Sequence, residues 1–389
     1  MPPRYAGRRC RVGQVRPRRE GGGRTLSGVT EGTDTVVDQP TPPPAPPRRG
    51  LTRRTWTLVI SLAVVLGLGL LGGFARVPYV ALGPGPTYDT LSQVNGADVV
   101  HVERQQTFPT GGTLTMTTVS LTDDVSLFGA LGLWVSGRYA LAPREEFFRP
   151  GESEQEVRDQ NVKAFQDSQT SAEVAALRYL QYPMKVVAAE VTKGSAADNV
   201  IQPNDRLLAV NGKDVTQYED VRTALENTKP GDQVDITFQR ESARQTARVT
   251  LGKQEDRQNG FLGVLPVDRA DVDFDIKISL SDVGGPSAGL LFALSIVDKL
   301  TPGELNGGQS VAGTGEIDDR GNVGRIGGIN FKMVAAYEAG ARTFLVPAGN
   351  CDEAKQHAPE GMKLVKVEKL ADAVSSLEAI NAGRGFPTC

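Results

Sequence analysis

Residues 279–294 read SLSDVGGPSAGLLFAL and decide the fold around them. Before this stretch, residues 274–280 alternate apolar and polar side chains, which predicts a half-buried strand. After it, residues 288–300 are an apolar run of helix length without a breaker, which predicts a helix. Ser287 stands at the junction, where backbone N–H groups at the helix end lack intrahelical partners and can face a developing oxyanion. A serine that merely caps the helix is the simpler interpretation of such a turn alone.

A second motif follows at residues 312–336, AGTGEIDDRGNVGRIGGINFKMVAA. It predicts two short strands around a turn at residues 318–321, then a glycine turn into a helix that carries Lys332. The residues after Lys332 are apolar, so its amine is expected to be partly desolvated. Desolvation lowers the pKa of a lysine and lets the neutral amine act as a base. A surface lysine at a helix start is the alternative interpretation.

Together the two motifs resemble the proteolytic domain of the Lon family of serine proteases, over about residues 261–374. The resemblance implies a Ser-Lys dyad in which Ser287 is the nucleophile and Lys332 the general base. It also implies that Thr314 orients the lysine amine, and that backbone N–H groups near Gly285 to Ala288 form the oxyanion hole. The family often has an aspartate where this chain has glycine, three residues before the serine. The motif G-x-x-x-x-G-K-[ST] does not occur, so the resemblance does not extend to the ATPase of the soluble Lon enzymes.

The segment from Lys185 to Gly252 resembles a bacterial-type PDZ domain, predicted at residues 184–253 as an insertion in the protease fold. Its strand-like runs are separated by a hairpin signal at Asn211-Gly212 and by a turn at residues 230–232. The resemblance implies a groove that captures an extended peptide, often a C-terminus, by strand addition.

The carboxylate-binding Gly-Φ-Gly-Φ pattern of PDZ domains is absent before Val186. A stretch of this kind, Gly260-Phe261-Leu262-Gly263-Val264, follows the segment instead. It is predicted to be a strand of the next domain, and a permuted binding loop is the alternative.

The N-terminal region predicts a membrane anchor. Residues 1–54 hold twelve arginines and four acidic residues, with many glycines and prolines, which predicts a disordered basic tail. Residues 55–75 carry no charge and are long enough to span a bilayer. The basic flank lies on the N-terminal side, so the tail is expected in the cytoplasm and the rest of the chain outside. A cleaved signal peptide and a buried core helix are the alternatives to an uncleaved anchor.

Composition excludes several kinds of function. The net charge of −3 combines about +8 in residues 1–54 with about −11 in the remainder, which argues against nucleic acid as a partner of the folded part. With only His101 and His357 and no C-x-x-C pair, no metal site and no cofactor are expected.

An extracytoplasmic location permits a disulfide, and Cys351 and Cys389 are predicted to pair. The apolar residues 128–134 are too short to span and are predicted to lie in the core or on lipid.

The predicted fold is α+β. Its parts are the tail (1–54), a transmembrane helix (55–75), the N-terminal part of the protease domain (76–183), the PDZ domain (184–253), the Lon-type proteolytic domain (260–380) and a C-terminal tail (381–389).

The predicted function is an ATP-independent, membrane-anchored serine endopeptidase that cleaves unfolded or flexible extracytoplasmic polypeptides. Its PDZ domain is predicted to recruit or gate substrates, possibly through their C-termini, and the family analogy implies a homo-oligomer, a hexamer. One alternative is a non-catalytic membrane-anchored PDZ scaffold. The other is an α/β-hydrolase that uses the G-x-S-x-G pattern with Asp352 and His357.

Overall fold

The computed structural model describes residues 52–255, 258–280 and 283–389. The predicted tail therefore lies almost wholly outside the described residues, as do Ser281 and Asp282 of the opening stretch. The chain divides into two units, residues 1–60 and 61–389, and the second holds the folded body.

The apolar segment forms helix α1, Arg53–Phe74. It is the one helix of the described residues that is long and apolar enough to cross a membrane, with a mean hydropathy of 2.3. A single helix of this kind near the N-terminus is by itself modest support for an anchor.

A six-stranded mixed sheet organises the body, in the order β18-β17-β14-β5-β1-β6. The strands β5, β14, β17 and β18 run parallel, and β1 is antiparallel to both β5 and β6. Their bounds are β1 (Tyr79–Asp89), β5 (Thr113–Thr122), β6 (Ala140–Pro143), β14 (Ser310–Gly313), β17 (Thr343–Pro347) and β18 (Lys363–Val367). Parallel pairing requires crossover connections, which the helices of the body supply.

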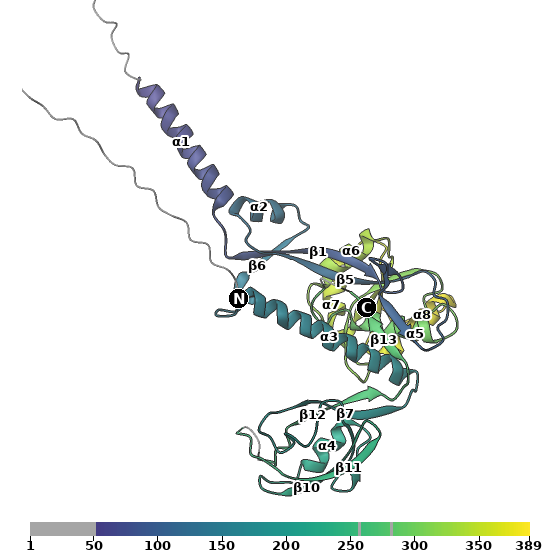
Figure 1. Ribbon diagram of the computed structural model, residues 1–389. Helices are drawn as coiled ribbons and strands as arrows, with labels where there is room; N and C mark the ends of the chain where they lie inside the picture. The colour runs from purple at the N-terminus through teal and green to yellow at the C-terminus, as the bar shows by residue number, and fades with distance from the viewer. Residues whose placement is uncertain (1–51, 256–257, 281–282) are drawn as a thin grey trace, which may run out of the picture. The chain divides into compact units, whose positions relative to one another are not determined.

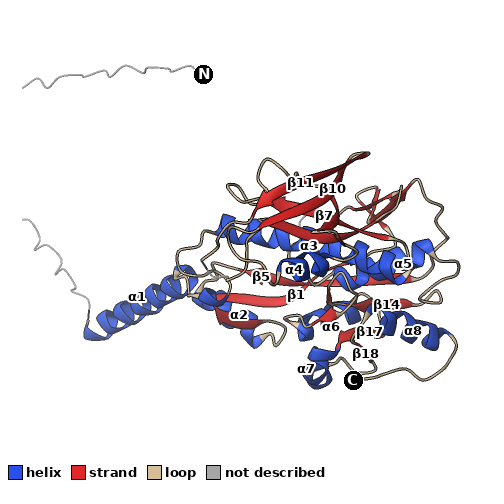
Figure 2. Cartoon of the chain, turned by 90° about the horizontal axis from the view of Figure 1, so that it is seen from below, coloured by secondary structure: helices blue, strands red, loops and turns tan. Residues whose placement is uncertain are grey.

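Helices cover both faces of this sheet (Figure 2). One face packs against α3 (Glu154–Tyr179), α5 (Gly289–Leu300) and α8 (Leu370–Asn381). The other packs against α6 (Ile329–Glu338) and α7 (Cys351–His357). Alternate residues of β17 enter the two cores, Leu345 with α5 and Phe344 with α6, as the period of a strand requires. Helix α3 begins after a capping box formed by Ser153 and Glu156.

The remaining elements of the body are short. They are β2 (Gln93–Val94), β3 (Ala97–Asp98), β4 (Val100–Glu103), α2 (Leu127–Val135), η1 (Arg144–Glu146), β13 (Asp275–Ile278), β15 (Glu316–Ile317), β16 (Val323–Gly324) and η2 (Ala348–Asn350). The predicted strand before Ser287 is β13, which pairs with β4, and the predicted helix after it is α5. The hairpin β15–β16 and the helix α6 have the order that the second motif predicts.

The PDZ segment follows α3 directly (Figure 1). It comprises β7 (Met184–Val191), β8 (Arg206–Val210), β9 (Lys213–Asp214), α4 (Tyr218–Leu225), β10 (Gln233–Arg240), β11 (Ala243–Thr250) and β12 (Val264–Ala270). Its sheet has the order β11-β10-β8-β7-β12, with a hydrophobic core of its own.

The stretch at residues 260–264 leads into β12, which pairs with β7 from Val264 to Ala270. The prediction that this stretch is a strand of the next domain is therefore wrong. The strand β12 completes the PDZ sheet, because it covers the edge of β7 that β8 leaves free. The alternative interpretation, a binding loop supplied from the C-terminal side of the segment, has the correct topology.

Cys351 and Cys389 are joined by a disulfide, with their Cα atoms 5.1 Å apart. The bond attaches the start of α7 to the end of the chain, beside the core that lies under α6. The last residues also pair with the sheet, through a bridge between Thr388 and Val365.

Candidate active site

The backbone of Ser287 is held by the second motif. Its carbonyl oxygen accepts hydrogen bonds from the Gly315 N–H at 2.9 Å and from the Thr314 hydroxyl at 3.0 Å. The Leu290 N–H donates in turn to the Gly315 carbonyl at 3.1 Å. Three hydrogen bonds thus fix the first turn of α5 against the segment between β14 and β15.

Helix α3 holds the other side of the serine turn. The Ser168 hydroxyl donates to the Pro286 carbonyl at 2.9 Å, and the Gly285 N–H donates to the Asn161 carbonyl at 2.9 Å. Gly285 has φ +82°, a left-handed conformation that favours glycine.

Gly289 allows the close approach of α5 to its neighbours. A Cβ at this position would lie 2.8 Å from both Ile317 Cγ2 and Ser168 Oγ, closer than van der Waals contact permits. Glycine is therefore required where the helix begins, for packing reasons.

Lys332 lies in the first turn of α6, and its side chain is directed at the serine. Its Nζ is 2.8 Å from Ser287 Oγ and donates to the Thr117 carbonyl of β5 at 2.7 Å. The residue is only 3% exposed, and burial lowers the pKa of its amine to about 8. A substantial fraction of the amine is therefore neutral near pH 8 and able to accept the serine proton.

A cavity of about 350 Å³ opens beside the two side chains. Besides residues 283–288 and Lys332, it is lined by Pro86, Met116, Thr118, Val119, Glu316, Ile326 and Gly327. The Glu316 carboxyl is half-buried in this wall, and its burial raises the pKa of the carboxyl above the usual value. The cavity offers room for part of a polypeptide at the Ser287 hydroxyl.

The predicted oxyanion donors differ in availability. The Gly285 N–H is occupied by Asn161, so it is not available to an oxyanion in this conformation. Among the described residues, no acceptor partners the N–H groups of Ser287 and Ala288, and Ala288 caps α5. The N-terminal end of α5 adds the favourable dipole.

Thr314 differs from its predicted role. Its buried hydroxyl donates to the Ser287 carbonyl, whereas the lysine amine bonds to Ser287 Oγ and to the Thr117 carbonyl. The threonine thus acts on the serine backbone, because the lysine arrives from α6 beside β5. No sequence pattern indicated Thr117, whose contribution is a backbone carbonyl that any residue would offer. Asn161 and Ser168 were not among the predicted site residues, because their contacts with the serine turn arise from the packing of α3 against it.

The residues required by the hydrolase alternative lie elsewhere. Asp352 and His357 are on α7, and the His357 ring pairs with the Glu353 carbonyl at 2.9 Å. Neither residue lines the Ser287 cavity, and the group on the serine hydroxyl is Lys332.

A second cavity of about 440 Å³ lies in the PDZ segment, between α4 and residues 258–266. From α4 it is lined by Tyr218, Val221, Arg222 and Leu225. Opposite them run Phe261, Leu262 and Gly263, the stretch predicted to belong elsewhere. An apolar groove between a helix and a strand is the geometry in which an extended peptide adds to a sheet.

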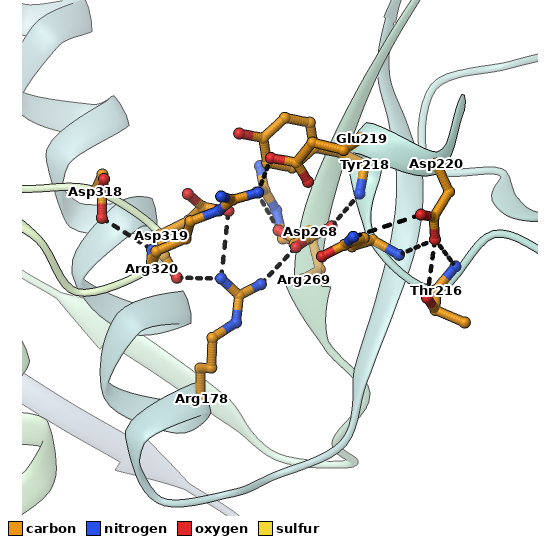
Figure 3. Close-up of polar contacts among 11 residues, drawn as sticks. Arg178, Thr216, Tyr218, Glu219, Asp220, Asp268, Arg269, Asp318, Asp319 and Arg320 are labelled. Carbon is orange, nitrogen blue, oxygen red and sulfur yellow. Dashed lines mark hydrogen bonds and ion pairs between the residues drawn. The ribbon is translucent and has the colours of Figure 1, made fainter. Parts of the chain in front are cut away.

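A buried carboxylate connects this groove to the protease part (Figure 3). Asp268 of β12 accepts from the Tyr218 N–H at 2.8 Å, at the start of α4, and forms an ion pair with Arg178 of α3. Arg178 also donates to the Asp319 carbonyl at 2.6 Å, in the turn of the β15–β16 hairpin.

The same turn contacts α4 directly. Arg320 forms an ion pair with Glu219, and its guanidinium lies 5.6 Å from the centre of the Tyr218 ring. One end of the groove helix therefore rests on the hairpin that follows Gly315, the residue bonded to Ser287.

Two family models match the chain. Residues 155–251 match the PDZ domain, and residues 269–379 match the Lon protease (S16) C-terminal proteolytic domain. The chain thus carries a PDZ domain and the proteolytic domain of serine-type Lon peptidases.

Curated relatives agree with the second match. The Lon protease of Phenylobacterium zucineum is 32% identical over 141 residues, which cover 35% of this chain and 17% of that protein. The Lon protease of Methylocella silvestris is 38% identical over 120 residues, 30% of this chain and 15% of that protein. The chain thus spans about a sixth of the length of these relatives. Among solved structures, the PDZ domain of the SdrC-like protein from Listeria monocytogenes is 19% identical with a TM-score of 0.20, covering 21% of this chain and 87% of that one.

Proposed function

We propose that this protein is a serine endopeptidase with a Ser287–Lys332 dyad. The observation that carries the proposal is the 2.8 Å contact between the serine hydroxyl and a buried lysine whose pKa is lowered to about 8. The neutral amine takes the proton of Ser287 as Oγ attacks the peptide carbonyl. The N–H groups of Ser287 and Ala288 stabilise the oxyanion of the tetrahedral intermediate, and the lysine then returns the proton to the leaving amine.

The enzyme acts at the outer side of a membrane in this proposal. Helix α1 supplies the single span, and the basic residues before it favour a cytoplasmic N-terminus. A disulfide between Cys351 and Cys389 is compatible with an oxidising compartment.

The proposed substrates are unfolded or flexible polypeptides, cleaved without ATP. The motif G-x-x-x-x-G-K-[ST] does not occur in the 389 residues, so the proposal gives these residues no role in nucleotide binding. The reaction needs no cofactor beyond the dyad, since the base and the nucleophile are both side chains. A homo-oligomer, a hexamer by analogy with Lon enzymes, is part of the same proposal.

The PDZ groove recruits or gates these substrates. Its apolar lining and its position between α4 and the strand β12 support binding of an extended C-terminal segment. The contacts of Asp268 and Arg320 support gating, because they join the groove helix to the hairpin beside the active site.

Two substitutions in the full chain test the dyad. With an unfolded protein substrate, Ser287→Ala and Lys332→Ala are each expected to lower kcat/KM by at least about 10²–10⁴-fold, the usual contribution of a positioned base. Lys355→Ala is the matched control, because Lys355 is exposed on α7 and should retain full activity.

Wild-type turnover in either dyad variant would refute the mechanism. A wild-type protein that binds C-terminal peptides in its PDZ groove but cleaves no polypeptide would instead support the scaffold alternative.

A further inference from the structure

Helix α2 presents an apolar face that the described residues leave uncovered. Its nine residues, LFGALGLWV, include no charged side chain. Five large side chains on one side are 48–71% exposed: Leu127, Phe128, Leu131, Trp134 and Val135. Their spacing of i, i+1, i+4, i+7 and i+8 defines one face of a helix. We propose that this face lies in the outer interface of the lipid bilayer, as a second membrane contact beside α1.

The start of α2 is fixed to the end of α1. The Leu127 N–H donates to the Ala75 carbonyl at 3.0 Å, and the Val77 N–H donates to the Val125 carbonyl at 3.1 Å. Gly72 is the one buried residue of α1, and a Cβ there would collide with the Phe128 ring. The aromatic ring therefore rests directly on the last turn of α1.

This contact sets the depth of α2. Gly72 is two residues before the end of α1, which is about 3 Å along the helix axis. A helix of 22 residues is about as long as the hydrocarbon core is thick, so its last turn reaches the boundary between acyl chains and headgroups. When α1 spans the membrane, Phe128 lies at that boundary, and the rest of the exposed face continues from it.

The opposite face of α2 packs on the catalytic body. Ala130 and Leu133 belong to a small core with Ala81 of β1, Val125 and Leu141 of β6. One side of α2 thus packs on the sheet, and the other side is the uncovered apolar face. Ala81 of this core lies on β1, the strand whose Pro86 lines the Ser287 cavity.

Lipid is the occupant that the surroundings favour. The exposed face of α2 is continuous, through Phe128 and Gly72, with the exposed apolar surface of α1. Tryptophan is enriched where a helix meets the headgroups, and Trp134 is the most exposed aromatic residue of α2. An apolar face without charges, laid in the interface plane, is the geometry of a monotopic helix.

Tryptophan fluorescence tests the inference, which rests on the proposed membrane anchor. The chain contains two tryptophans, Trp56 in α1 and Trp134 in α2. The full-length Trp56→Phe variant, reconstituted in phosphatidylcholine vesicles, therefore reports on Trp134 alone. We expect bromine near the headgroup end of the acyl chains to quench its emission more than bromine near the chain ends, and aqueous iodide to have little effect. The Trp134→Phe variant reports insertion of α1 in the same vesicles.

Each result supports or overturns the inference. If Trp56 is quenched by brominated lipid while Trp134 is quenched only by iodide, α2 faces water, and the inference fails while the anchor stands. If Trp134 is shielded from both quenchers, protein such as a second copy of the chain covers the face, and the inference also fails. If brominated lipid quenches neither tryptophan, α1 is not inserted, and the anchor and this inference fail together.

Discussion

Lys332 Nζ lies 2.8 Å from Ser287 Oγ and 2.7 Å from the Thr117 carbonyl, in a position that is 3% exposed. Among the residues that the structure describes, no carboxylate shares these contacts with the amine. Burial without a compensating negative charge disfavours the charged form, which explains the lowered pKa. The same burial lets the amine act as a base and lowers the free energy of unfolding of the chain.

The first prediction concerns the pH dependence of activity. Because the base must be neutral, the fraction of active enzyme falls as pH drops below the lysine pKa of about 8. We expect kcat/KM to fall about tenfold for each pH unit well below that value and to reach a plateau above it. The measurement is a pH–rate profile on an unfolded polypeptide, with circular dichroism to establish that the fold persists. A flat profile between about pH 6 and 9 would show that the amine is not the base.

The second prediction concerns stability. The pKa of Lys332 is about 8 in the folded chain, whereas the ordinary pKa of a lysine is 10.5. The fold therefore disfavours the protonated amine, which lowers the free energy of unfolding. This loss of stability is largest below about pH 8, decreases as the pH rises above 8, and vanishes above about pH 10.5. A shift of this size corresponds to about 3 kcal/mol.

Lys332→Met should therefore abolish activity and raise the free energy of unfolding at neutral pH. The gain should be about 2 kcal/mol, because the substitution leaves the Thr117 carbonyl without its donor. Urea unfolding at pH 7 and at pH 10.5 measures it, and the gain should disappear at the higher pH. Lys355→Met, at an exposed position, should change stability by less than about 0.5 kcal/mol. Equal free energies of unfolding for the wild type and Lys332→Met at pH 7 would count against an amine that is buried without a carboxylate partner.

The dyad could be predicted because its two residues sit in motifs with strong local signals. The Gly-Gly-Pro turn before Ser287 and the apolar run after it define the start of α5, and a glycine turn precedes the helix of Lys332. The local structure around each residue follows from such patterns, and the family resemblance supplied their meeting in space.

The groups that hold the dyad could not be predicted in the same way. The Thr117 carbonyl reaches Lys332 because β5 pairs with β14 across almost 200 residues of sequence. Backbone acceptors carry no side-chain signature, and long-range parallel pairing is not encoded in any local pattern. Residues 260–264 were predicted to be a strand of the next domain, whereas they lead into β12, which pairs with β7 of the PDZ sheet. A local pattern does not show which sheet offers the free edge.

The third prediction separates two roles for Thr314. Its hydroxyl donates to the Ser287 carbonyl, so Thr314→Val should loosen the serine backbone without changing the environment of the amine. We expect kcat to fall roughly tenfold, the equivalent of one lost hydrogen bond, with the midpoint of the pH–rate profile unchanged. The readout is kcat together with that midpoint. A midpoint displaced by more than about half a pH unit would mean that Thr314 acts on the lysine itself.

The fourth prediction concerns communication between the PDZ groove and the active site. If the groove gates activity, a peptide with an apolar C-terminus, added in trans, should stimulate cleavage of an unfolded substrate that does not itself bind the groove. The contact between Arg320 and the start of α4 is a direct path for this effect. Arg320 lies in the turn that follows β15, and β15 begins directly after Gly315.

Arg320→Gln should therefore reduce the stimulation severalfold, while the Kd of the peptide and the basal turnover stay within about twofold of wild type. Arg248→Gln is the matched control, since Arg248 forms an exposed pair with Asp235 on the PDZ strands away from α4 and should leave stimulation intact. Peptide binding by fluorescence anisotropy and turnover with and without peptide give the three quantities. Undiminished stimulation in Arg320→Gln would assign the coupling to another contact, of which the Asp268–Tyr218 bond is the next to test. Because a charge on an exposed hairpin is altered and no core residue changes, loss of stimulation with unchanged Kd could not be attributed to a misfolded groove.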